Sequence, residues 1–345
     1  MKKQLAILLV LALTLGLLAG CSAPTEPSEK KQYQATFLTL FDTVTYISGL
    51  ADSEEAFQEQ AQAIHDQLLV YHRLFDIYNS YEGLNNLKTV NDNAGIGPVE
   101  VDGEIIRLLT DCRTYYELTG HTVNVAMGSV LRLWHEARNA GLDDPAHAAL
   151  PDEQALKKAA AHTSWDNVIV DPEASTVYLS DPDMRLDVGA VAKGWSAQQV
   201  AGTAPAGLLI SVGGNVCATG PKDASGTPWV VGIANPDTGE DYLHTLYVTD
   251  LAVVTSGDYQ RYYVVDGKIY HHIIDPQTLY PADRWQSVTI ACLDSGLADA
   301  LSTALFLLPA EEGQALLDQC GAEAMWVDLR GNCYYSPGFR DLIRT

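Results

Sequence analysis

Short apolar runs recur through the second half of the chain and predict β-strands. Each run is rich in β-branched residues, and Gly, Asp and Pro residues typical of turns separate one run from the next. An earlier run, Phe37–Ser48, has the same character and predicts a strand or a hairpin. The runs of the second half are Val168–Val170, Thr176–Leu179, Leu208–Val212, Trp229–Ile233, Leu246–Val248, Ala252–Thr255, Arg261–Val265, Ser287–Ala291 and Ala324–Val327.

Apolar residues at helical spacing predict helices in both halves. We expect Asp52 to cap the first of them, with Glu55 three residues later. Between the helices, Phe75–Asn93 is an irregular stretch rich in Asn, Asp and Tyr, and Pro145–Pro151 is a loop. In the first helix the apolar positions are Phe57, Ala61, Ile64, Leu68 and Tyr71. Further helices are predicted at Gly103–Leu118, Gly128–Ala140, Glu153–Ala161, Ala192–Val200, Ala298–Leu308 and Glu311–Asp318.

The order of these elements predicts the fold class. Strands and helices are mixed without a regular βαβ alternation, so we expect an α+β fold with a mixed or antiparallel sheet and flanking helices. The chain shows neither an internal repeat nor a second linker. A single domain over residues 33–345 is therefore the simplest organisation.

The first twenty residues have the pattern of a targeting segment. Lys2 and Lys3 precede an apolar run from Leu5 to Leu18, which is short for a transmembrane helix and fits a secretory signal peptide over residues 1–20. The run ends in Leu-Ala-Gly-Cys, which resembles a bacterial lipobox with Cys21 as the lipidated residue. Residues 21–32 are rich in Pro, Ser, Glu and Lys and predict a flexible tether. We expect a globular body anchored by lipid at the extracytoplasmic face of a bacterial membrane.

Composition excludes several classes of protein. The 345 residues include 21 Lys and Arg against 44 Asp and Glu, a net charge of -23, and 47% are hydrophobic. This apolar content argues against intrinsic disorder, and the acidity argues against nucleic-acid binding and against electrostatic membrane binding. The five cysteines after Cys21 include no CxxC pair, so a zinc cluster or disulfide framework has little support. Whether Cys320 pairs with Cys333 is left open.

Common enzyme motifs are missing from the sequence. It has no G-x-G-x-x-G opening a helix after a strand, no G-x-x-x-x-G-K-[ST], no G-x-S-x-G and no H-E-x-x-H. Two glycine-containing segments still attract attention. In LDVGAVAKG, a Gly turn leads into a helix that carries Lys193 in its first turns, a pattern that suits an anion as well as a solvated lysine. In SVGGN, the glycine pair permits either a tight bend or a close backbone approach to a ligand.

Three further segments carry candidate catalytic and metal-binding groups. TSGDYQRY contains Asp258, and HHIIDP follows it; on a strand His271 and His272 would face opposite sides, so at most one enters a site. In LADALSTAL, Asp299, Ser302 and Thr303 fall on one helix face, and oxygen ligands of this kind suit Mg²⁺ or Ca²⁺. The alternative is that Asp299 caps its own helix.

Taken together and in this order, the five segments resemble the ApbE family, the FAD:protein FMN transferases, and the resemblance runs from about Phe37 to Leu308. The resemblance implies transfer of FMN from FAD to a Thr or Ser hydroxyl of an acceptor flavoprotein or membrane redox subunit, with release of AMP. It also implies a divalent cation, Mg²⁺ with Ca²⁺ or Mn²⁺ possible. A metal-dependent FAD pyrophosphatase and a non-catalytic FAD-binding lipoprotein remain as alternatives.

The resemblance also implies roles for individual residues. His272 is the best candidate for the base that deprotonates the acceptor hydroxyl, with His271 second, and Asp258 is a further catalytic candidate. The implied metal ligands are the backbone oxygen of Ala190 and the side chains of Asp299, Ser302 and Thr303. The implied FAD contacts are Phe41, Tyr78, Thr122, Val123, Asn124, Asp187, Lys193 and Ile273.

Three segments depart from the family pattern. The chain has Phe41-Asp42-Thr43 where the family often has Met-Gly-Thr. It has Thr122-Val123-Asn124 where the family often has Ala-Phe-Asp, so a carboxylate is missing there. Leu279 stands where the family usually has Gly, which predicts a different conformation for the turn after HHIIDP.

Overall fold

The computed structural model describes residues 30–238 and 241–344. The predicted signal peptide, Cys21 and most of the predicted tether lie outside the described residues. Within the described ranges, none of the helices combines the length and the apolar character needed to cross a membrane.

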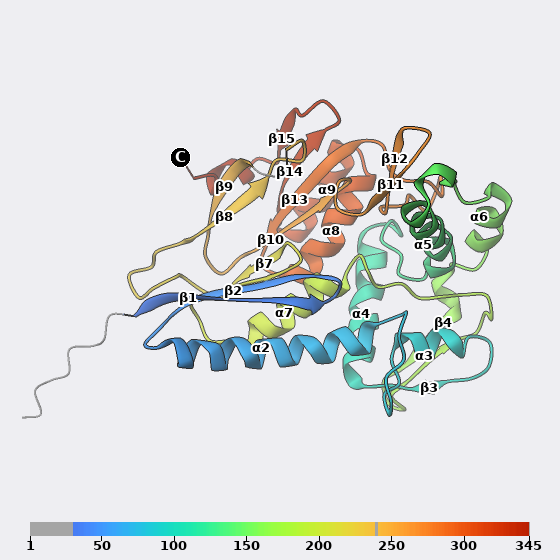
Figure 1. The fold of residues 1–345 in the computed structure, drawn as a ribbon, viewed down its shortest axis with the longest axis horizontal. Helices are drawn as coiled ribbons and strands as arrows, with labels where there is room; N and C mark the ends of the chain where they lie inside the picture. Colours follow the sequence, from blue (N-terminus) through green and yellow to red (C-terminus); the bar gives the residue numbers. More distant parts are fainter. Residues whose placement is uncertain (1–29, 239–240, 345) are drawn as a thin grey trace, which may run out of the picture.

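An eight-stranded sheet forms the centre of the molecule (Figure 1). Every pair of neighbouring strands in it is antiparallel, which confirms the α+β class with an antiparallel sheet. Five of the runs predicted from the sequence fall in this sheet and overlap six of its strands, because the Phe37–Ser48 run spans both β1 and β2; the two strands that were not predicted, β7 and β15, are short. In sheet order the strands are β1 (Lys31–Leu40), β2 (Thr43–Ala51), β6 (Leu208–Val212), β7 (Asn215–Ala218), β10 (Ala252–Gly257), β13 (Trp285–Cys292), β14 (Glu323–Asp328) and β15 (Cys333–Tyr335).

Three smaller sheets surround the central one. The first contains β3 (Val99–Glu100), β5 (Thr176–Leu179) and β4 (Val168–Asp171). The second is the pair β8 (Trp229–Ala234) and β9 (Tyr242–Val248), and the third is the pair β11 (Tyr262–Val265) and β12 (Lys268–His271).

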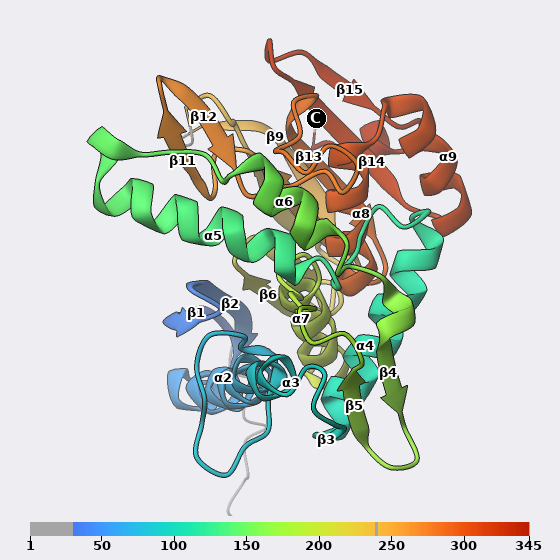
Figure 2. The ribbon, with the colours of Figure 1, turned by 90° about the vertical axis from the view of Figure 1, so that its right-hand side faces the viewer.

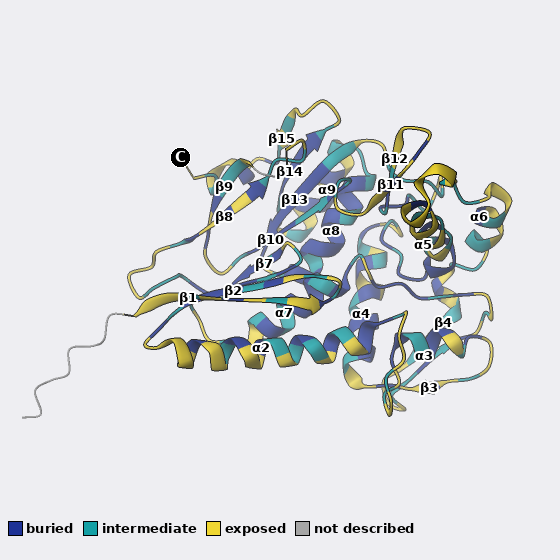
Figure 3. Ribbon diagram, viewed as in Figure 1, coloured by how far each residue is buried: buried dark blue, intermediate teal, exposed yellow. Residues whose placement is uncertain are grey.

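The helices pack against the sheets and against one another through their apolar residues. Helices α7 and α8 pack against each other and against the central strands β7, β10 and β13. Both are largely buried, whereas α2 and α5 each keep one exposed face (Figure 3). The α-helices are α2 (Glu54–Phe75), α3 (Leu87–Asp92), α4 (Gly103–Leu118), α5 (Gly128–Asp143), α6 (Glu153–Ala160), α7 (Ala192–Thr203), α8 (Ser295–Leu307) and α9 (Ala310–Cys320). Short 3₁₀ turns are Pro145–His147, Trp165–Asn167 and Phe339–Leu342.

Buried apolar side chains form one large cluster and two smaller ones. The large cluster joins the central sheet to α2, α4, α7 and α8. A second lies between the sheet and β8–β9. The third joins α5 and α6 to the β11–β12 hairpin, with Trp134 and Tyr263 among its members, and Figure 2 shows these elements side by side. The hairpin is therefore held against α5 by apolar packing.

Several local predictions differ from the structure. Ser53, not Asp52, caps α2, because the Ser53 side chain accepts the backbone N–H of Ala56 at 3.1 Å. The stretch predicted to be irregular contains α3, which begins with a capping box at Asn86. All five cysteines of the described residues are free thiols, so Cys320 and Cys333 are not paired.

Candidate active site

The crossing of α7 and α8 brings together two of the segments selected from the sequence. The backbone N–H of Gly194 donates to Oδ2 of Asp299 at 2.8 Å. A side chain at position 194 would not fit, because its Cβ would lie 2.3 Å from the backbone oxygen of Ser295 and 2.5 Å from Cβ of Asp299. Gly194 therefore lets the start of α7 approach the carboxylate closely.

We expect Gly194→Ala to destabilise the protein by about 1–3 kcal/mol, as overpacking in a core does. It should also weaken FAD binding, because α7 must move away from Asp299. Denaturant unfolding measures the first effect and flavin fluorescence titration the second. The matched control is Gly202→Ala on the same helix, where a Cβ meets nothing within 4 Å. Equal stability of the two variants would contradict this description.

The negative charge of Asp299 is compensated by one neighbouring lysine. Its side chain is buried, and Nζ of Lys193 lies 3.6 Å from Oδ2. Burial raises the pKa of Asp299, and the ammonium of Lys193 opposes that rise. Asp299 does not cap its own helix, because the cap of α8 is Asp294, whose Oδ1 accepts the N–H of Leu297 at 2.8 Å. The alternative interpretation of Asp299 as a cap is thus wrong.

The donor atoms around Asp299 fit a divalent cation. Within the described residues, Oδ1 of Asp299 and the hydroxyl of Thr303 have no hydrogen-bond partner, and Thr303 lies one helical turn further along the same face. Ser302 is buried, donates to the backbone oxygen of Asp299 at 2.8 Å and is 2.7 Å from the hydroxyl of Ser256. Carboxylate, hydroxyl and carbonyl oxygens are the ligands that Mg²⁺ and Ca²⁺ prefer.

The turn before α7 presents the remaining predicted metal ligand. Gly189 and Ala190 form a turn, and Asp187 closes it by accepting the N–H of Gly189 at 2.9 Å. Helix α7 then begins without a side-chain cap. The N–H groups of Ala192 and Gly194 are bonded to Val188 and Asp299, so the positive environment for an anion at this end of the helix comes from Lys193 and the helix dipole.

The structure distinguishes the two adjacent histidines. His271 is buried at the end of β12, accepts the N–H of Ile273 at its Nδ1 and lies 2.8 Å from the backbone oxygen of Ala282 through its Nε2. Both ring nitrogens of His271 are thus satisfied by the backbone, which suits a structural role. His272 follows the strand, and its Nδ1 lies 3.3 Å from the backbone oxygen of Arg261.

That contact defines which nitrogen of His272 can act as a base. Because a carbonyl oxygen only accepts, Nδ1 carries the proton, and the lone pair of the neutral ring is on Nε2. Burial lowers the pKa of His272 to about 3, and the positive charges of Arg261 and Lys193 contribute. His272 is therefore neutral at physiological pH and lies within electrostatic reach of Lys193.

A second group of polar side chains adjoins this site. The hydroxyl of Tyr78 is 2.9 Å from Nδ1 of His135 on α5, and that nitrogen is 3.9 Å from Oδ2 of Asp187. Desolvation of the hydroxyl and the negative charge of Asp187 raise the pKa of Tyr78, so it is a neutral phenol. His135 also lines a small cavity between α5 and the β11–β12 hairpin, together with His272.

The other predicted FAD contacts lie in tight turns. Phe41 has φ of 54° in the β1–β2 turn, and its N–H donates to Nδ1 of His72 at 3.2 Å. Val123 is buried, and the neighbouring Asn124 bonds to the backbone of Ala126 and Thr163. The side chain of Asn124 is thus occupied by its own loop. Thr122 lies in the same loop as Asn124, whereas Ile273 follows β12, is buried, and accepts the N–H of Ala282 at its backbone oxygen.

Asp258 lies two residues after Ser256, whose hydroxyl is 2.7 Å from that of Ser302. The N–H of Asp258 donates to the backbone oxygen of Gln286, and burial, with the nearby charge of Asp237, raises its pKa to about 6. Within the described residues, no hydrogen bond or ion pair joins Asp258 to His272, Lys193 or Asp299. The structure therefore gives no geometric support to Asp258 as part of the catalytic group.

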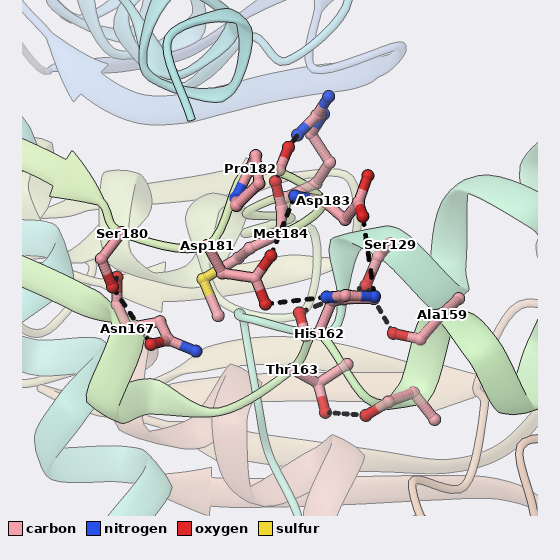
Figure 4. A network of polar contacts seen from close by, with 12 residues as sticks. Ser129, Ala159, His162, Thr163, Asn167, Ser180, Asp181, Pro182, Asp183 and Met184 are labelled. Carbon is pink, nitrogen blue, oxygen red and sulfur yellow. Dashed lines mark hydrogen bonds and ion pairs between the residues drawn. The ribbon is translucent and has the colours of Figure 1, made fainter. Parts of the chain in front are cut away.

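Another cluster of possible metal ligands lies near the loop of Asn124 (Figure 4). The ring of His162 is between two carboxylates, with Nδ1 2.7 Å from Asp181 and Nε2 3.8 Å from Asp183. A single imidazole offers only one nitrogen to a given ion, and the carboxylate of Asp183 is 67% exposed. The arrangement is explained by an ion pair that joins the end of α6 to the loop after β5.

Three residues of this region were not selected from the sequence. Ser256 contacts Ser302, His135 contacts Tyr78, and Arg261 contacts both His272 and Phe41. Ser256 and Arg261 lay in the TSGDYQRY segment, but nothing in that pattern showed what they contact. His135 lay outside the selected segments and is recognised only when helix packing places it beside Tyr78.

An α+β fold whose site combines a buried carboxylate, a lysine at a helix start and a neutral histidine defines a protein suited to a phosphate-containing ligand. Residues 39–326 match the ApbE family, and the chain belongs to that family. The FAD:protein FMN transferase of Treponema pallidum is 36% identical over 278 residues, 75% of each chain. That of Klebsiella pneumoniae is 32% identical over 268 residues, 74% of this chain and 80% of the other. The crystal structure of the ApbE protein from Thermotoga maritima has a TM-score of 0.80 and 30% identity, covering 91% of this chain and 100% of that one.

Proposed function

We propose that this chain is an FAD:protein FMN transferase, which moves FMN from FAD to a Thr or Ser hydroxyl of an acceptor protein and releases AMP. The observation that carries the proposal is the pairing of Lys193 with buried Asp299, within electrostatic reach of neutral His272. The relatives named FAD:protein FMN transferase support the same activity.

The chemistry follows from the charges of these groups. Nε2 of His272 accepts the proton of the acceptor hydroxyl, and the hydroxyl oxygen then attacks the phosphorus on the FMN side of the pyrophosphate. A new phosphoester bond forms as the bond to the AMP phosphate breaks, and AMP leaves with the electron pair. The ammonium of Lys193 stabilises the negative charge on the phosphate oxygens.

A divalent cation, with Mg²⁺ as the first choice, would be held by Asp299, Thr303, Ser302 and the backbone oxygen of Ala190. When bound, it would supply charge neutralisation at the pyrophosphate. Lys193 and the N–H of Gly194 hold the Asp299 carboxylate in place. The hydroxyl of Ser256 orients that of Ser302 in the same way.

The predicted lipobox indicates where in the cell the reaction would take place. With Cys21 lipidated and residues 21–32 as a tether, the enzyme would act at the extracytoplasmic face of the membrane. Its acceptors would be secreted flavoproteins or membrane redox subunits with an exposed Thr or Ser segment. Labelling cells with a radioactive fatty acid tests this, because wild-type protein should incorporate label and a Cys21→Ala variant should not.

Chromatography of FAD, FMN and AMP after incubation with Mg²⁺ tests the activity. We expect AMP to appear only when an acceptor flavoprotein domain is present, in amounts equal to the FMN that the acceptor gains. AMP and free FMN in equal amounts without acceptor would indicate a pyrophosphatase. If FAD binds but stays intact in the presence of a domain that is known to be flavinylated, the protein is a flavin carrier. Either result would overturn the proposal.

A further inference from the structure

Arg261 contacts the catalytic candidate His272 through its main chain. The residue immediately precedes β11, and its backbone oxygen accepts the backbone N–H of His272 at 3.1 Å as well as the ring Nδ1–H at 3.3 Å. The backbone N–H and the ring Nδ1–H of His272 thus both donate to the same carbonyl oxygen. This arrangement fixes the orientation of the ring and the tautomer that leaves Nε2 available.

The side chain of Arg261 extends toward a different part of the site. Its Nη2 donates to the backbone oxygen of Phe41 at 3.4 Å, in the β1–β2 turn. The side chain is exposed, and it makes no ion pair within the part of the chain that the structure describes. Its positive charge acts on both Tyr78 and His272. The guanidinium therefore lies near three separate segments, those of Phe41, Tyr78 and His272. Among the described residues, no carboxylate forms an ion pair with it.

We propose that Arg261 positions His272 through its main chain and, through its guanidinium, binds the phosphate oxygens of FAD as a second cation beside Lys193. The inference rests on the proposed function and assigns a role to a residue that neither the sequence motifs nor the metal site required. A planar guanidinium suits this task, because its fork of donors can bind two phosphate oxygens at once.

The groups that face His272 favour its neutral form from every side. Lys193 comes from α7, His135 and Arg138 from α5, and His271 from β12. Tyr263 and Tyr270 of the β11–β12 hairpin line the same cavity. No carboxylate lines this cavity, so protonation of the ring would add a positive charge beside Arg261. Removing the Arg261 charge should therefore make protonation easier.

The test compares Arg261→Gln and Arg261→Lys with wild type, with Lys268→Gln as the control on the same hairpin. Both Arg261 variants keep the backbone oxygen that holds the ring. We expect Arg261→Gln to raise the Kd for FAD about tenfold, to lower kcat about tenfold, and to raise the pKa of His272 by about one unit. Arg261→Lys should restore the pKa but only part of the FAD affinity, because an ammonium lacks the fork. Lys268→Gln should change none of the three.

These readouts separate the inference from the proposed function. FAD binding by fluorescence titration and the His272 titration by NMR require no acceptor and no turnover. If wild type transfers no FMN, the proposed function fails, while the Kd and the titration still decide the role of Arg261. Wild-type FAD affinity and an unmoved His272 titration in Arg261→Gln would overturn the inference, whatever happens to kcat.

Discussion

Replacing Asp299 by Asn is expected to reduce FMN transfer by about 10³-fold or more. The amide keeps the size of the side chain and can still accept the N–H of Gly194, but it cannot supply the negative charge that holds a divalent cation. A metal that neutralises charge in phosphoryl transfer contributes several kcal/mol, which corresponds to at least this loss. The measurement is kcat with saturating FAD and acceptor over a series of Mg²⁺ concentrations.

A direct binding experiment accompanies the kinetic one. Mn²⁺ binding followed by electron paramagnetic resonance should show one site in wild type and none in Asp299→Asn. The control is Asp294→Asn at the cap of the same helix, where Oδ1 serves only to accept the N–H of Leu297. It should keep both metal binding and activity. Asp299→Asn with undiminished Mn²⁺ binding would remove Asp299 from the metal site.

Replacing His272 by Ala is expected to lower kcat by about 10²–10⁴-fold, the usual contribution of a general base. FAD affinity should change much less, because the neutral ring provides little attraction for phosphate. His271→Ala, in contrast, should mainly reduce stability, since both nitrogens of His271 bind the backbone. Transfer rates, FAD titrations and thermal unfolding of the two variants check this difference. A loss of FAD binding that matched the loss of kcat in His272→Ala would indicate a structural role instead.

The pH dependence of the wild-type enzyme offers an independent check on His272. A pKa of about 3 means that the ring is already deprotonated at pH 5, so raising the pH further adds no base. We therefore expect kcat/KM to be constant between pH 5 and pH 8, with no fall toward the acidic end of this range. An ordinary histidine would instead give an acid limb near its usual pKa of about 6.5. Such a limb, absent in His272→Ala, would contradict the environment described for this ring.

The sequence predicted the helix face of the site but not what it contacts. The spacing of Asp299, Ser302 and Thr303 places them on one face of any helix, so helical periodicity alone was sufficient. The hydrogen bond from Gly194 to Asp299 spans 105 residues and depends on how two helices cross. No local pattern contains that information. For the same reason the sequence left both the cap and the metal ligand open as interpretations of Asp299.

The histidine pair shows a different limit. Alternation along a strand predicted opposite directions for His271 and His272, on the premise that both lie within one strand. In the structure β12 ends at His271, which pairs with Tyr262, and His272 turns back to the carbonyl of Arg261. Where the strand ends depends on its pairing with β11, not on the residues of the segment itself. The fold class was predictable because it needs only the order of elements, whereas the orientation of the base needed the register.

The intact mass of an acceptor flavoprotein domain tests the central claim most directly. The domain would be incubated with FAD, Mg²⁺ and either wild-type enzyme, Asp299→Asn or His272→Ala, each beginning at Lys31 so that no lipid anchor is needed. The account predicts a mass gain equal to one FMN with wild type, removed when the acceptor Thr or Ser is changed to Ala, and little or no gain with either variant. Equal modification by wild type and both variants would show that the crossing of α7 and α8 and the ring of His272 are not where FMN is transferred.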